Sequence, residues 1–178
     1  MKDSIAIIPA RGGSKRIPGK NLRPFLGRPI IDYPIQTCLT SGLFERVIVS
    51  TDSEAIALEA FKMGVESIQR PKSISGDKAT VVMAIRHVLD CLPIYPKFVC
   101  VLFPTSVFAD EGNLRVSHYR IVSEQCDGVA SMVPYSHPIE RAFWMDAEEQ
   151  EMTMINPKNE FDMTQAFRPS YHDAAQFY

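Results

Sequence analysis

Short apolar runs rich in β-branched residues alternate along most of the chain with longer stretches of helical periodicity. Strands that are buried on both faces are predicted at Ser4–Pro9, Arg46–Thr51 and Phe98–Phe103. Helices are predicted at Ile30–Ser41, Ser53–Met63, Ala79–Leu92 and Asp110–Gln125. This order predicts an α/β fold, with an open, mostly parallel sheet, helices on both faces and right-handed crossovers.

The predicted helix ends carry recognisable stop and start residues. Gly42 and Gly64 each follow a periodic stretch, at the position where a left-handed residue commonly ends a helix. Pro93 stops the third helix. Asp52 or Ser53 is predicted to cap the second helix.

The last third of the chain has a different character. A further core strand is predicted at Asp127–Val133, and prolines then punctuate short polar and aromatic pieces. We interpret Tyr135–Ser170 as an excursion from a single 1–178 domain, either a surface β-hairpin or an oligomerisation arm. The chain returns in a predicted strand at Tyr171–Tyr178, and we expect the natural protein to continue beyond it.

Composition and charge exclude several function classes. The chain has 178 residues, 19 Lys and Arg, 21 Asp and Glu, and a net charge of −2, so it lacks the basic footprint that duplex nucleic acid requires. No apolar run reaches the length of a membrane span and no export signal is recognisable, which predicts a cytoplasmic protein. The cysteines have no zinc-site spacing and are predicted to be buried thiols: Cys38, Cys91, Cys100 and Cys126.

The loop after the first strand, Arg11–Asn21, carries the clearest chemistry. No acidic residue occurs from Ser4 to Ile31, whereas six basic residues do. Ligands of open α/β sheets bind beyond the carboxyl ends of the strands, where backbone N–H groups of a Gly-Gly pair can surround phosphate oxygens. Arg11, Lys15 and Lys20 would add positive charge for a triphosphate.

Two common phosphate motifs do not fit this loop. A Walker A motif fails because Ser14 stands in place of the first glycine and Asn21 in place of the magnesium-binding Ser or Thr. The dinucleotide motif G-x-G-x-x-G fails because the glycines stand at 12, 13 and 19. The sequence therefore argues against a dehydrogenase.

The segment Ile8–Asn21, Ile-Pro-Ala-Arg-Gly-Gly-Ser-Lys-Arg-Ile-Pro-Gly-Lys-Asn, resembles the signature loop of the acylneuraminate cytidylyltransferases, which make CMP-activated nonulosonic acids. Further similar segments follow in order: Val49-Ser-Thr-Asp, Arg70-Pro, Ser75-Gly-Asp, Ala79-Thr and Pro104-Thr-Ser. The segment Tyr171–Tyr178 looks more like the pseudaminic acid enzymes of this family. The resemblance implies a Rossmann-like nucleotidyltransferase fold and a homodimer in which the excursion pairs the subunits.

The resemblance also implies a reaction and a set of binding residues. CMP would pass from CTP to the 2-hydroxyl of a nine-carbon 2-keto acid sugar, pseudaminic acid by preference, with release of pyrophosphate. The implied catalytic residues are Arg11, Lys15 and Lys20. The implied nucleotide contacts are Ala10, Arg11, Gly13, Ser14, Lys15, Lys20, Asn21, Arg70, Asp77 and Thr80, and the implied sugar contacts are Phe103, Thr105, Arg168, His172 and Asp173.

Structural roles remain open for several of these residues. Arg70 could meet a base carbonyl or a phosphate, or form a structural contact, and Thr80 could simply cap the third helix. Asp52 and Asp77 could be helix caps without a catalytic part. Phe103 stands where related sialate enzymes carry glutamine, which implies a different sugar pocket.

The resemblance implies a divalent ion, usually Mg²⁺, held by an Asp-x-Asp stretch that does not occur by Tyr178. The ligands are therefore expected beyond that residue. Alternatives are the same transfer to N-acetylneuraminate, legionaminate or the eight-carbon Kdo, and a nucleotide-binding protein without turnover.

Overall fold

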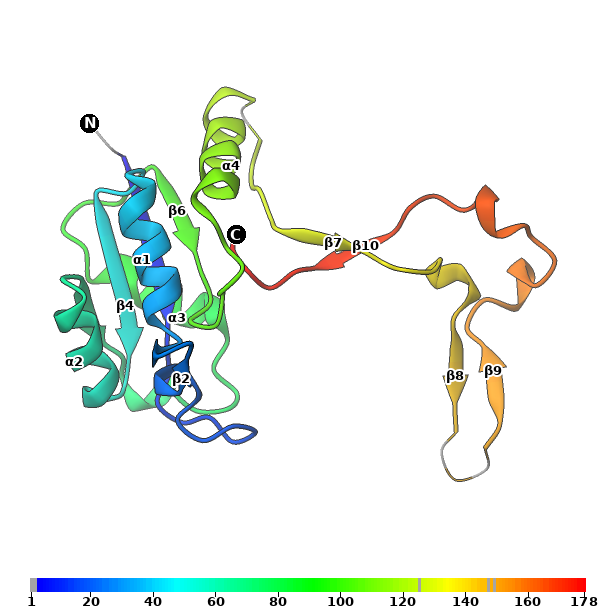
Figure 1. Ribbon diagram of the computed structural model, residues 1–178, viewed down its shortest axis with the longest axis horizontal. Helices are drawn as coiled ribbons and strands as arrows, with labels where there is room; N and C mark the ends of the chain where they lie inside the picture. Colours follow the sequence, from blue (N-terminus) through cyan, green and yellow to red (C-terminus); the bar gives the residue numbers. More distant parts are fainter. Residues whose placement is uncertain (1–2, 125, 147, 149) are drawn as a thin grey trace. The chain divides into compact units, whose positions relative to one another are not determined.

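The computed structural model describes residues 3–124, 126–146, 148 and 150–178. Its first compact unit is built around a four-stranded parallel sheet (Figure 1). The strand order is β5-β4-β1-β6. These strands span Ser4–Pro9 (β1), Arg46–Thr51 (β4), Glu66–Gln69 (β5) and Phe98–Val101 (β6). β1 is central, because Ile7 stands opposite Ile48 on one side and Val101 on the other.

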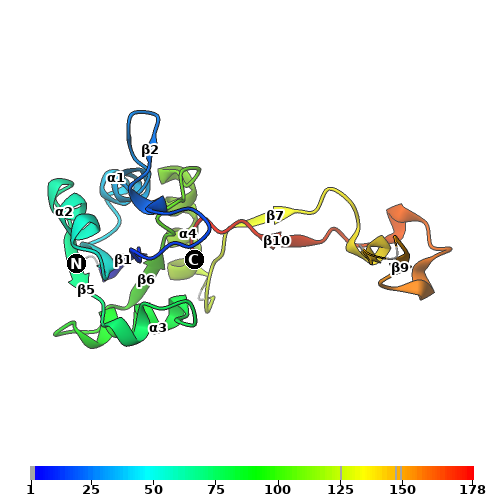
Figure 2. The same ribbon diagram turned by 90° about the horizontal axis from the view of Figure 1, so that it is seen from below.

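Helices cover both faces of this sheet. They span Asp32–Ser41 (α1), Glu54–Lys62 (α2), Val81–Asp90 (α3) and Glu111–Ser123 (α4). Figure 2 shows α3 on one side of the sheet and α1 and α2 on the other. The sequence expectation of an α/β fold with a parallel sheet between helices is therefore confirmed.

Alternate residues of β1 serve the two faces, as strand geometry requires. Ala6 and Ile8 belong to a buried cluster with residues of α1, α2 and α4. Ile5 and Ile7 belong to a second buried cluster that includes Val88 of α3. All of these side chains are buried, so β1 is apolar on both faces and is held at a fixed position in the core.

Short elements complete the first compact unit, which comprises residues 1–130 and 175–178. The loop after β1 contains a 3₁₀ turn (η1), and a tight β2-β3 hairpin follows it. A second 3₁₀ turn (η2) lies between β5 and α3. Their bounds are Lys20–Leu22 (η1), Pro24–Phe25 (β2), Arg28–Pro29 (β3) and Lys72–Ile74 (η2).

The described residues of the second compact unit, 131–174, form two antiparallel strand pairs and three 3₁₀ turns. β7 pairs with β10, and β8 forms a hairpin with β9. The bounds are Met132–Pro134 (β7), Ile139–Arg141 (η3), Phe143–Met145 (β8), Met152–Met154 (β9), Pro157–Asn159 (η4), Thr164–Ala166 (η5) and Tyr171–Asp173 (β10). The predicted excursion, 135–170, lies within this unit, and its role as an arm stays a prediction.

Two strand predictions for the last third of the chain are wrong in their extent or pairing. Asp127–Val133 is not a core strand, because pairing begins only at Met132 and joins β10 rather than the central sheet. The predicted strand Tyr171–Tyr178 ends at Asp173 as β10. Phe177 then makes an isolated antiparallel bridge to Leu102 beside β6, and the Tyr178 N–H donates to the Val101 carbonyl over 3.0 Å.

The glycines predicted to end two helices are confirmed, whereas the cap predicted for the second helix is not. Gly42 and Gly64 adopt the expected left-handed conformation, with φ of 66° and 74°. Ser53 stands at the start of α2 without a side-chain capping bond, and the Asp52 carboxylate accepts instead from the Gly12 N–H. The cap predicted for the second helix is therefore wrong, because a distant loop uses the carboxylate.

The cysteine prediction holds for one residue of four. Cys38 is buried, Cys100 and Cys126 are half-buried, and Cys91 is exposed. All four are free thiols. Within the described residues, none of the helices combines the length and apolar character needed to cross a bilayer.

Asp32, the first residue of α1, is buried, and its Oδ1 has no hydrogen-bond partner among the described residues. Burial raises the pKa of this carboxyl. A folded-state pKa above the unfolded value means that the ionised form weakens folding at neutral pH. We expect Asp32→Asn to raise the free energy of unfolding at pH 7, by up to about 1 kcal/mol. Urea unfolding at pH 7 and pH 3 measures this.

At pH 3 the carboxyl is protonated in both states, so the advantage of the Asp32→Asn variant should vanish there. Asp90→Asn, which neutralises an exposed carboxylate at the end of α3, is the matched control. A gain that persists undiminished at pH 3, or a loss at pH 7, would contradict the expectation.

Candidate functional site

A cavity of about 790 Å³ opens where the ends of β1, β5 and β6 meet the start of α3. Its walls come from the loop after β1, Arg70 after β5, the residues before and within the first turn of α3, and the segment after β6. The lining residues are Pro9, Arg11, Ser14, Lys15, Arg16, Ile17, Lys20, Asn21, Arg70, Asp77, Ala79, Thr80, Val81, Ala84, Phe103, Pro104, Thr105 and Ala175. This is the carboxyl edge of the parallel sheet, where ligands of open α/β folds bind.

Two hydrogen bonds anchor the basic loop to the fold. The Gly12 N–H donates to Asp52 Oδ1 over 2.7 Å, which ties the loop to the end of β4. Asn21 Nδ2 donates to the Arg11 carbonyl over 3.0 Å and closes the loop on itself. Gly12 also has little room, because a Cβ at this position would lie 2.9 Å from Ser53 Cβ. The loop is therefore held at both ends rather than free.

Asn21 offers an unused acceptor at the cavity. The side chain is 5% exposed, and its Oδ1 has no partner among the described residues. A buried amide oxygen without a partner carries a desolvation cost that a hydrogen-bond donor on a ligand would remove. Because Asn21 lines the cavity, a ligand hydroxyl or amine there could supply that donor.

Arg70 is a buried cation that faces the cavity. It is 6% exposed, and it donates from Nε to Ser50 Oγ over 3.2 Å and from Nη2 to the Ser50 carbonyl over 2.8 Å. Burial lowers the pKa of this guanidinium, and the nearby Asp52 carboxylate opposes that effect. Arginine remains charged even so, and Arg70 therefore presents a positive charge that the fold holds in a fixed orientation.

Arg11 and Lys15 converge on one carboxylate. Arg11 Nη1 lies 3.0 Å from Asp77 Oδ1, and the Lys15 ammonium pairs with Asp77 Oδ2. The hydrogen bonds from Lys15 and then Arg11 lower the pKa of the Asp77 carboxyl. The carboxylate is therefore ionised at neutral pH, and Asp77 does not cap α3.

Thr80 fills the structural role that the sequence left open. Its side-chain oxygen accepts from the Met83 N–H over 3.2 Å at the start of α3, which is an N-cap. The residue lines the cavity as well, so the capping role and a ligand contact are compatible.

The cavity gathers most, though not all, of the expected site residues. Ala10 is fully buried and its N–H donates to the Ser50 carbonyl, and Gly13 lies outside the lining. Arg168, His172 and Asp173 belong to the 131–174 unit, so a sugar-binding role for them stays a prediction. His172 Nδ1 lies 3.0 Å from its neighbour's carbonyl oxygen within that unit.

Eight lining residues were not named as site residues from the sequence: Pro9, Arg16, Ile17, Ala79, Val81, Ala84, Pro104 and Ala175. Arg16 and Ile17 could have been included from their place in the basic loop. Val81 and Ala84 are three positions apart on α3 and so share a helix face. No sequence signal marks Ala175.

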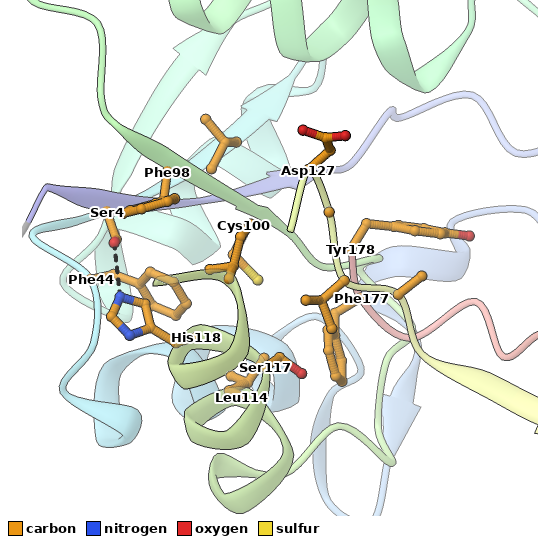
Figure 3. A pocket seen from close by; sticks show the side chains of 15 residues that line it. Ser4, Phe44, Phe98, Cys100, Leu114, Ser117, His118, Asp127, Phe177 and Tyr178 are labelled. Atoms are coloured by element: carbon orange, nitrogen blue, oxygen red, sulfur yellow. Dashed lines mark hydrogen bonds between the residues drawn. The ribbon is translucent and has the colours of Figure 1, made fainter. Parts of the chain in front are cut away.

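A second cavity, of about 330 Å³, lies between β6 and α4 and is mainly apolar (Figure 3). His118 of α4 lies within hydrogen-bond distance of Ser4, with Nε2 and Oγ 3.1 Å apart. Burial raises the pKa of the Cys100 thiol to about 12, so the thiol is neutral. The lining contains no Lys or Arg, and this cavity is therefore not suited to a polyphosphate.

Metal-binding side chains do not gather in the described part of the chain. No group of three or more His, Cys, Asp or Glu residues there could hold a metal ion. The carboxylates beside the cavity, Asp52 and Asp77, already accept from the loop or pair with its cations. The described residues thus do not bring together three protein ligands for a resident Mg²⁺ ion.

Residues 5–116 match the family model described as cytidylyltransferase. The chain belongs to the cytidylyltransferase family. A pseudaminic acid cytidylyltransferase of Campylobacter jejuni is 34% identical over 180 residues, covering 98% of this chain and 77% of the relative. A CMP-N,N'-diacetyllegionaminic acid synthase of Legionella pneumophila is 30% identical over 160 residues, covering 86% of this chain and 66% of the relative.

The fold is also that of solved cytidylyltransferases. A CMP:2-keto-3-deoxy-manno-octonic acid synthetase, solved with CTP, superposes with a TM-score of 0.71 at 16% identity, covering 98% of this chain and 72% of that structure. The expected family, enzyme class and fold are therefore confirmed.

The two loop glycines make a matched pair for mutation. Gly12→Ala places a methyl group against Ser53 at 2.9 Å, whereas a Cβ at Gly13 meets nothing within 4 Å. We expect Gly12→Ala to cost about 1–3 kcal/mol of stability and to weaken CTP binding. Gly13→Ala should leave stability within about 0.5 kcal/mol. Thermal unfolding and CTP titration of both variants measure this, and equal destabilisation by the two would contradict it.

Proposed function

We propose that this protein transfers CMP from CTP to the 2-hydroxyl of a nonulosonic acid, with pseudaminic acid as the preferred acceptor. The observation that carries the proposal is the basic cavity at the carboxyl edge of the sheet in a chain of the cytidylyltransferase family. The preference for pseudaminic acid rests on relatives of that name, at 34% identity over 98% of the chain.

The reaction needs no covalent enzyme intermediate. The acceptor hydroxyl oxygen attacks the α-phosphorus in line, its proton passes to water, and the bond from that phosphorus to the bridging oxygen breaks to release pyrophosphate. Negative charge grows on the phosphate oxygens, so fixed cations lower the barrier. Much of the remaining rate enhancement comes from holding the two substrates in register.

The cavity residues divide this work by position. Arg11, Lys15 and Lys20 come from the loop and would neutralise the triphosphate. Arg70, which donates to the Ser50 carbonyl, would hold one end of the nucleotide. Asn21 Oδ1, which has no partner among the described residues, would accept a hydrogen bond from the nucleotide.

Phe103 and Thr105 stand on the segment after β6 and line the same cavity. The Phe103 ring makes an edge contact with Tyr178, with centroids 5.7 Å apart. Ser106, in contrast, is fully buried and donates to the Gln176 carbonyl, so its role is structural. An aromatic wall at residue 103 would favour an acceptor with apolar substituents.

The decisive assay is pyrophosphate release from CTP, with pseudaminic acid, N,N'-diacetyllegionaminic acid, N-acetylneuraminate and Kdo compared as acceptors. We expect release with pseudaminic acid at a kcat/KM at least tenfold above the others. The legionaminic acid is the second candidate, because a relative named for it covers 86% of the chain. CTP binding without pyrophosphate release in the presence of any of the four acceptors would replace the proposal with that of a nucleotide-binding protein.

Lys20 offers a test of the charged loop that disturbs little else. It is half-buried, lines the cavity and has no ion pair among the described residues. We expect Lys20→Met to lower kcat/KM for CTP by about a hundredfold or more, because a transition-state cation is removed. Lys72→Met, an exposed lysine of η2 outside the lining, is the control and should stay within about twofold. Equal effects in the two variants would contradict the assignment.

We also propose that the 131–174 unit contacts a second copy of the chain. Phe143, Trp144, Met145 and Phe161 expose between 53% and 91% of their surface within this 44-residue unit. Exposed aromatic and methionine side chains are enriched at interfaces. Light scattering should give twice the 20.0 kDa chain mass at micromolar concentration, and a monomer would count against the proposal.

A further inference from the structure

Asp77 stands out in the cavity because its charge opposes that of its surroundings. It is the one acidic side chain among the described lining residues. The basic side chains around it are Arg11, Lys15, Arg16, Lys20 and Arg70. A carboxylate in a site built for a polyphosphate would repel that ligand, so its presence calls for a physical reason.

The contacts of Asp77 show which cations it occupies. Its two oxygens accept from Arg11 and Lys15, one each, from a position more than sixty residues along the chain. Phosphate oxygens accept from guanidinium and ammonium groups in the same way. Asp77 thus takes the contacts that a phosphate would take.

These contacts are also weak enough to exchange. The Asp77 and Lys15 side chains are 46% and 83% exposed, and solvent-exposed ion pairs contribute little to stability. A polyphosphate carries several charges and can engage more cations of the cavity at once, Arg70 and Lys20 among them. Replacement of Asp77 by the triphosphate at Arg11 and Lys15 is therefore favourable, but competition from Asp77 lowers the affinity for the nucleotide.

We infer that Asp77 is a resident counter-anion, which holds Arg11 and Lys15 between turnovers, yields them to the triphosphate, and recaptures them as pyrophosphate leaves. The inference deepens the proposed function and rests on it. Asp77 is a positioning residue in this scheme and makes no bond to the reacting atoms. Its removal should therefore strengthen product binding rather than weaken it.

The test is equilibrium titration of inorganic pyrophosphate into the whole protein, wild type and Asp77→Asn. We expect the variant to bind pyrophosphate about three- to tenfold more tightly, because the competing carboxylate is gone. Product inhibition by pyrophosphate should strengthen by the same factor. Asp77→Glu keeps the charge and should restore affinity to within about twofold of wild type.

Asp90→Asn is the matched control, since it removes the same charge from the end of α3, outside the cavity lining. It should leave pyrophosphate affinity within about twofold, which separates a local competitor from a change in net charge. A purely structural role for Asp77 predicts the opposite sign, because loosened cations bind anions less well.

Weaker or unchanged pyrophosphate binding by Asp77→Asn would overturn the counter-anion role while leaving the proposed function intact. If the wild-type protein binds neither CTP nor pyrophosphate, the proposed function fails, and the counter-anion role fails with it. Tighter binding by both Asp77→Asn and Asp90→Asn would also overturn it, in favour of a general charge effect.

Discussion

The burial of β1 on both faces, with a hydrogen-bonded strand on each side, is the constraint on which the rest of the structure depends. β4 and β6 fix its edges, and two separate apolar clusters fix its faces. Such a strand cannot shift without losing both clusters. The basic loop begins where β1 ends, so the position of its first residues is fixed by that strand. The hydrogen bond from the Gly12 N–H to Asp52 fixes the next part of the loop. The packing of β1 in the core therefore determines where the loop cations of the cavity lie.

The repetitive part of the fold was predictable because it depends on local periodicity. β1 and β4 match their predicted bounds, and the helices differ only at their ends. β5 was missed because Glu66-Ser-Ile-Gln carries a single apolar residue, and its pairing with β4 decides its conformation. Asp127–Val133 failed for the converse reason, because an apolar stretch alone does not reveal which partner strand is available.

The part of the cavity that could be predicted from the sequence is the part formed by one continuous basic loop. The cations of residues 11–21 line the cavity as expected, and so does Thr80 at the start of α3. The partners chosen by carboxylates were not predictable, because Asp52 and Asp77 look like helix caps in the sequence. Each is instead claimed by a group more than thirty residues away. A tertiary contact outweighed local capping at both positions: a hydrogen bond from a backbone N–H at Asp52 and ion pairs at Asp77.

β7 and β10, the first and last strands of the 131–174 unit, pair with each other. The Ala174 N–H donates to the Ser131 carbonyl over 2.9 Å, so the entry and exit of the unit are hydrogen-bond neighbours. Joining two points so close requires a very short connection, whose closure entropy is small. The unit is therefore a single insertion between neighbouring points of the chain, and a change in its length would leave the strand order of the central sheet unchanged.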